Sequence, residues 1–113
     1  MKTIRILWKN ARTGWFNFNW DGVITPESVI HISISEALLP TGGSIFGTAG
    51  LGALRHRGAA PIWVKNVRPH GPNTGDTISG GVEFFAQIDW GGPLHIVTDI
   101  TVLDPPVAAH SVG

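Results

Sequence analysis

The clearest pattern in this chain is an alternation of apolar and polar residues in its last third. Apolar side chains occupy alternate positions over Val82–Trp90, and a similar alternation resumes over Leu94–Val102 after the turn sequence Gly91-Gly92-Pro93. Successive side chains of a β-strand point to opposite faces, so each segment is predicted to be a strand with one apolar face. The short connection predicts that the two strands pair as a β-hairpin.

The three-residue loop of this hairpin sets its register, because it aligns the apolar residues of the two strands. A shift of one residue would turn the apolar side chains to the opposite face, so a single register is expected. On the polar face this register predicts three pairs: Asp89 with His95, Phe85 with Asp99, and Glu83 with Thr101.

Strand patterns also recur earlier in the chain. No segment shows the period of an amphipathic helix. The Arg68–Pro72 segment contains two prolines, which lack a backbone donor, and it is expected to end the strand before it. The earlier segments predicted as strands are Lys2–Trp8, Trp15–Trp20, Val29–Ser35 and Ile62–Val67.

The glycine-rich segment Pro40–Ala60 does not fit this scheme. A loop of that length without secondary structure is uncommon in a compact domain. The segment either contains weak strands, at Ser44–Thr48 and Gly52–His56, or forms a lid or binding loop. We favour the strands, because the apolar residues of the segment must be covered.

Short strands separated by turns, with little or no helix, predict an all-β protein. We expect an antiparallel β-sandwich of six to eight short strands, immunoglobulin-like or jelly-roll-like. Residues 1–104 are expected to form a single β-sandwich domain. Residues 105–113 begin with two prolines and are expected to form a C-terminal tail.

Composition narrows the classes of partner. The chain has 113 residues and no cysteine, so disulfides and thiolate metal sites are excluded. Eight basic residues are balanced by eight acidic ones, which cannot give the positive field that nucleic acid binding needs. Only 14% of the residues are charged, and such a surface favours covering by other subunits, so a homo-oligomer is expected.

The N-terminal segment lacks the features of a targeting or membrane sequence. Lys9 and Asn10 interrupt the short apolar run that precedes them. We therefore expect no signal peptide and no membrane span. The sequence predicts a cytoplasmic protein, or one exported without a classical signal peptide.

Tryptophan provides the strongest functional signal, with five tryptophans in a chain that has no tyrosine. Trp15 shares a strand face with Asn17 and Asn19, and Asp21 follows this strand. An exposed indole stacks on the apolar face of a sugar ring while amide and carboxylate groups bind its hydroxyls. The alternative is that the indoles lie in the core or in a subunit interface, which we expect for Trp20, Trp63 and Trp90.

The predicted Asp89–His95 pair is a second candidate for chemistry. A carboxylate beside an imidazole fixes its tautomer and could create a general base. Such a pair is also an ordinary stabilising contact between strands, which is the interpretation we favour. No motif supplies a nucleophile to accompany it.

Two basic segments, Arg55-His56-Arg57 and Arg68-Pro69-His70, could bind a carboxylate or phosphate, but solvated loop charge is the interpretation we favour. The histidines are dispersed, and neither the glycine-rich run 42–50 nor the turn 73–76 forms a complete phosphate or calcium motif. No metal and no cofactor are expected.

The function predicted from these features is non-enzymatic binding of a carbohydrate, or of another small polar ligand, by a β-sandwich. Its ligand-binding residues would be Trp15, Asn17, Asn19, Asp21, Asp89 and His95. A self-assembling structural subunit is the first alternative. The second is a small β-fold isomerase or cyclase that uses the Asp89–His95 pair.

Overall fold

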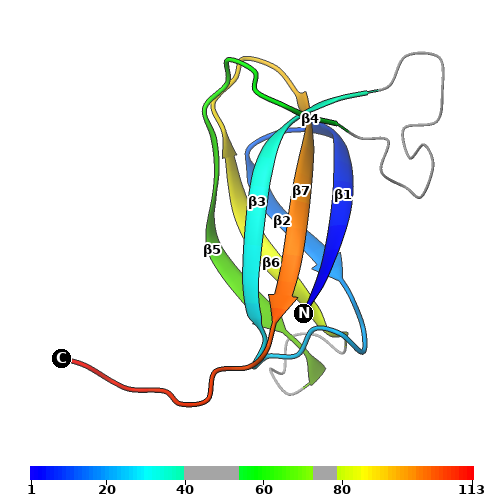
Figure 1. The fold of residues 1–113 in the computed structure, drawn as a ribbon. Coiled ribbons are helices and arrows are strands. Elements are labelled where there is room, and N and C mark those ends of the chain that lie inside the picture. The colour runs from blue at the N-terminus through cyan, green and yellow to red at the C-terminus, as the bar shows by residue number, and fades with distance from the viewer. Residues whose placement is uncertain (40–53, 73–78) are drawn as a thin grey trace.

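The structure is a computed structural model that describes residues 1–39, 54–72 and 79–113. Figure 1 shows two β-sheets that lie face to face, and all strand pairs are antiparallel. The strands are β1 (Lys2–Ala11), β2 (Gly14–Asn19), β3 (Val29–Leu38), β4 (Leu54–His56), β5 (Ile62–His70), β6 (Gly81–Ile88) and β7 (Leu94–Leu103). No α-helix occurs in the described ranges, so the predicted all-β sandwich is confirmed.

The strands pair in a nested order. One sheet has the order β1-β7-β3-β4 and the other has the order β2-β6-β5. The first strand therefore pairs with the last, and the second strand pairs with the one before the last. This nesting corresponds to the jelly-roll-like alternative of the predicted sandwich.

The predicted hairpin of the last third is wrong, although its apolar faces are correctly placed. Strand β6 pairs with β2 and β5, whereas β7 pairs with β1 and β3, so the turn sequence Gly91-Gly92-Pro93 connects the two sheets. Alternation shows which side of a strand is apolar, but two such sides can also be buried by facing each other across a sandwich. The cross-strand pairs predicted for Asp89, Phe85 and Glu83 therefore do not form.

The core lies between the two sheets and is rich in aromatic rings. The rings of Phe16 and Phe84 stack at 5.4 Å, and Trp8 contacts Phe16 edge-on at 5.1 Å. Thr98 is fully buried on the inner face of β7, and its hydroxyl accepts a hydrogen bond of 2.9 Å from the indole N–H of Trp8. The one polar group of each side chain is thus satisfied inside the core.

Strand β5 is longer than predicted. It continues through Arg68-Pro69-His70, the segment that was expected to end it. Strand β5 forms an edge of its sheet, where a missing backbone donor is tolerated. A register shift between Lys65 and Arg68 accompanies Asn66, whose φ of 52° is left-handed, so a bulge re-aligns the chain before the proline.

The glycine-rich segment is described only at its end. Strand β4 lies within the predicted strand Gly52–His56 and pairs with β3. The predicted strand Ser44–Thr48 lies outside the described residues, as do the run 42–50 and the turn 73–76.

The chain leaves the sheet after Leu103, and the segment Asp104–Gly113 is exposed and without regular structure. Figure 1 shows this segment leading away from the sandwich. The described part of the chain contains no helix long and apolar enough to cross a membrane.

Candidate functional site

The outer face of the three-stranded sheet carries a row of aromatic side chains. Phe84 and Phe16 point into the core, so their neighbours Phe85 and Trp15 point outward. Trp15 pairs with Phe85, and Phe85 pairs with Lys65 on its other side. We call Trp15, Phe85, Lys65 and Trp63 the aromatic face.

The members of the aromatic face contact one another. Trp15 meets Phe85 edge-on, with ring centroids 5.4 Å apart. The ammonium nitrogen of Lys65 lies 5.3 Å from the ring centroid of Phe85 and 5.7 Å from that of Trp63. These cation–π contacts hold the charge of Lys65 between two aromatic rings.

Two indoles of the aromatic face are open to solvent. Trp15 is 62% exposed and Trp63 is 41% exposed. The core covers the other face of this sheet, so the exposed aromatic area contributes little to folding. Contiguous apolar patches of this kind mark interaction surfaces. The aromatic face is therefore the best candidate for a binding surface.

Polar groups lie on both sides of the aromatic face. Gln87, the strand partner of Trp63, donates a hydrogen bond of 2.8 Å to the carboxylate of Asp89. On the other side, Arg68 and Glu83 form an ion pair of 2.6 Å. Both pairs are accessible, and they supply donors and acceptors beside the rings.

The polar residues predicted to accompany Trp15 form hydrogen bonds with other groups of the protein. Asn17 and Asn19 share the outer sheet face with Trp15, as expected, but the amide of Asn17 donates to Asn19 at 2.8 Å. The Asn17 carbonyl oxygen also lies 2.7 Å from the ring nitrogen Nε2 of the buried His70. Asp21 accepts a hydrogen bond of 2.8 Å from the backbone N–H of Gly80.

These contacts hold one end of the sandwich together. Gly80 has no room for a side chain, because a Cβ there would meet the carbonyl oxygen of Ile24. The structural role of Asp21 is therefore to fix a close backbone approach. Of the predicted set, Trp15 lies on the aromatic face and Asp89 is bound to Gln87, which is the strand partner of Trp63 and was not in that set.

The predicted Asp89–His95 pair is not formed. Asp89 follows β6, whereas His95 lies on β7 in the other sheet, and its ring nitrogen Nδ1 accepts a hydrogen bond of 3.1 Å from the backbone N–H of Asn10. The isomerase or cyclase alternative therefore loses the oriented base on which it depended. In the ranges that the structure describes, no group of three or more potential ligands could hold a metal ion.

The tryptophans include some that pack against the core and others that are exposed to solvent. Trp20 packs against the core, as expected, and so does Trp8. Trp63 and Trp90 are 41% and 54% exposed, so neither lies in the core, and their place in a subunit interface stays a prediction. The sequence could have predicted this for Trp63. Ile62 and Val64 point to the inner face, so Trp63 and Lys65, which alternate with them, point outward.

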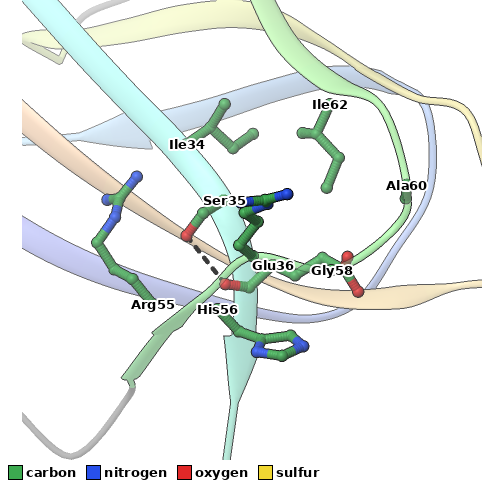
Figure 2. Close-up of a pocket in the computed structure, with 9 residues that line it drawn as sticks. Ile34, Ser35, Glu36, Arg55, His56, Gly58, Ala60 and Ile62 are labelled. Atoms are coloured by element: carbon green, nitrogen blue, oxygen red, sulfur yellow. Dashed lines mark hydrogen bonds between the residues drawn. The ribbon is translucent and has the colours of Figure 1, made fainter.

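A second feature is a pocket at the end of the sandwich, which we call the carboxyl pocket. It has a volume of about 370 Å³ and is lined by residues of β3, of β4 and of the segment that leads into β5. Figure 2 shows the carboxyl group of Glu36 beside Gly58 in this pocket. The oxygen Oε2 of Glu36 is buried and has no hydrogen-bond partner among the residues that the structure describes.

Sequence reasoning missed Glu36, because the strand was predicted to end at Ser35. Ile30, Ile32 and Ile34 point inward along β3, and the next inward position is occupied by Glu36, opposite the buried Ile96. A carboxyl group at a position where the pattern calls for an apolar residue was the available signal.

The two basic segments do not form a common rim. Arg55 lies on β4, and its guanidinium is 3.3 Å from the carboxylate of Asp99, which also forms a bidentate pair with Arg5 at 2.7 and 2.9 Å. The hydrogen bond and charge of Arg5 lower the pKa of Asp99, and Arg55 adds to this shift. Arg68 lies near the end of β5, and Figure 1 shows that β5 ends on the side of the sandwich opposite to β4.

Comparison with known protein families, curated proteins and solved structures found no match for this chain.

Proposed function

We propose that the protein is a carbohydrate-binding β-sandwich and that the aromatic face is its binding surface. The observation that carries the proposal is the exposure of two indoles, Trp15 and Trp63, on one face of one sheet. A sheet is a rigid support, so the rings are held in place before a ligand binds. This lowers the entropic cost of binding.

The chemistry of the surface suits a sugar. The C–H face of a pyranose ring stacks on an aromatic ring, and the exposed Trp15 and Trp63 offer such rings. Gln87 and Asp89 offer an amide and a carboxylate to the hydroxyl groups of a sugar bound at Trp63. The ammonium group of Lys65 adds a hydrogen-bond donor at the centre of the surface.

Self-assembly through the same surface is the competing proposal, since exposed aromatic area also favours subunit contacts. A symmetric dimer brings the same patch of two copies together. With Lys65 near its centre, such an interface would place two ammonium groups close to each other. The charge therefore favours a ligand over a second copy.

The test is binding of the full chain to a panel of immobilised glycans, with hits titrated in solution. We expect Trp15→Ala and Trp63→Ala each to weaken binding about tenfold or more. Trp90→Ala is the matched control, because Trp90 is 54% exposed but lies outside the aromatic face. It should bind as the natural chain does.

Absence of binding to every glycan at millimolar concentration would refute the proposal, as would binding that survives both substitutions. Light scattering of the natural chain and of Trp15→Ala distinguishes self-assembly from carbohydrate binding. An oligomer that dissociates on this substitution, without glycan binding, would favour self-assembly.

A further inference from the structure

The carboxyl pocket contains an unmet hydrogen-bonding requirement. Among the described residues, Oε2 of Glu36 is the one buried side-chain oxygen or nitrogen without a partner. Buried polar atoms are nearly always paired, and leaving a carboxyl oxygen unpaired is costly. Glu36 is also one of the residues that line the pocket, so a bound molecule that reaches its carboxyl group could supply the missing donor.

The position of the carboxyl group is fixed by its surroundings. A Cβ at residue 58 would overlap the Glu36 carboxyl group, so the glycine leaves the space that this group occupies. Figure 2 shows the two residues side by side. The strand pairing of Glu36 with Ile96 and with His56 holds its backbone on both sides.

The charges that line the pocket are of both signs. Arg55 forms an ion pair with Asp99, and Figure 2 shows the Arg55 side chain extending away from the Glu36 carboxyl group. Arg57 also lines the pocket and forms no hydrogen bond or ion pair with the described residues. The pocket therefore offers one carboxyl group and one guanidinium group that are free to bind.

The rest of the lining includes apolar surface. Ile34 and Ile62 belong to the pocket wall and pack against the core. A ligand that binds the carboxyl group, the guanidinium group and the apolar wall of the pocket has an ammonium group, a carboxylate and an aliphatic side chain. Charge-assisted hydrogen bonds to both charged groups would make such recognition selective.

We propose that the carboxyl pocket is a second binding site, independent of the aromatic face, and that it takes an aliphatic α-amino acid. Glu36 binds the ammonium group and Arg57 binds the carboxylate. Ile34 and Ile62 contact the side chain. The volume of about 370 Å³ is large enough for a molecule of this size.

The experiment is a titration of the full chain with L-leucine, followed by the NMR signals of the Ile34 and Ile62 methyl groups and by calorimetry. Two analogues of similar shape each lack one charged group: 4-methylpentanoate has no ammonium and 3-methylbutylamine has no carboxylate. We expect L-leucine to bind about tenfold or more tightly than either analogue.

Glu36→Gln is nearly isosteric and should weaken L-leucine binding about tenfold or more, because it removes the charge that pairs with the ammonium group. Glu27→Gln is the matched control, since Glu27 is exposed and lies outside the pocket. Arg57→Gln should weaken binding to a similar extent and provides a second test if Glu36→Gln does not fold. Trp15→Ala should leave L-leucine binding unchanged.

Two results would overturn the inference. One is that L-leucine causes no methyl shift and no heat at millimolar concentration. The other is that both analogues bind as tightly as L-leucine, which would show that the pocket binds through its apolar wall alone. Glycan binding without L-leucine binding would refute this site and leave the aromatic face unaffected.

Discussion

The outer faces of the two sheets differ in how many of their side chains are paired or buried within the protein. On the four-stranded sheet, Asp99 is held by two arginines, and the hydroxyls of Thr3 and Thr101 lie 3.0 Å apart. Val97 on the same face is fully buried, between Leu7 and Ser35 in the strand register. The three-stranded sheet instead leaves two indoles exposed.

This difference separates structural contacts from an available surface. Side chains of the first face interact mainly with each other, so their loss should affect stability. Side chains of the aromatic face have surface that is exposed to solvent and available to a ligand, so their loss should affect binding more than stability. Substitutions matched between the two faces test this distinction.

The largest effect is expected from placing a charge on each face. Val97→Asp buries a carboxylate without a partner and should lower the free energy of unfolding by about 3 kcal/mol or more. Trp15→Asp places the same group in solvent and should change it by less than about 0.5 kcal/mol. Urea denaturation followed by circular dichroism measures both. Equal effects of the two substitutions would abolish the contrast.

A smaller difference is expected between the two ion pairs. Asp99→Asn breaks the bidentate pair with Arg5 and the contact with Arg55, and should cost about 1 kcal/mol. Glu83→Gln removes the more exposed pair with Arg68 and should cost less than about 0.5 kcal/mol. The same denaturation experiment distinguishes them. A greater loss for Glu83→Gln would reverse the order.

The Asp99 pair also predicts a pH dependence. Because its pKa is lowered in the folded protein, Asp99 is charged at pH values at which the unfolded chain binds a proton. The stabilisation is complete above the unfolded-state pKa of about 4, and it is lost as the pH falls through the folded-state pKa. Unfolding of the natural chain and of Asp99→Asn between neutral pH and strong acid should show a smaller acid loss in the variant. Parallel curves would contradict this assignment.

The smallest effect on stability is expected at the aromatic face itself. Trp15→Ala removes a side chain that is 62% exposed and loses one edge-on contact with Phe85. The melting temperature should fall by only a few degrees, corresponding to less than about 0.5 kcal/mol. A large loss of stability would show that Trp15 is a structural residue and would weaken the proposed binding role.

Local patterns predicted the strands and their inner faces, but not the partners of the strands. Val82, Phe84 and Ile100 are buried as the alternation required. Pairing is decided by the whole set of strands, so a turn of three residues could not distinguish a hairpin from a connection between sheets. The same limit applies to Asp89 and His95, whose predicted contact depended on that hairpin.

The candidate site was predicted in part for the same reason. The outward position of Trp15 follows from its strand pattern. The hydrogen bonds that engage Asn17 and Asp21 come from His70 and Gly80, which are more than fifty residues away along the chain. The inward position of Glu36 could have been predicted from the alternation, because it continues the inward row of Ile30, Ile32 and Ile34.

The nested strand order has a consequence for folding during synthesis. Strand β1 is the first to be made, yet its strand partner in the structure is β7, the last. Until β7 has left the ribosome, Ile4, Ile6 and Trp8 have no neighbouring strand to complete their sheet. Pairing across nearly the whole chain also slows folding, because a long loop must close first. The nascent protein thus has to protect an unpaired apolar strand until translation reaches its final part.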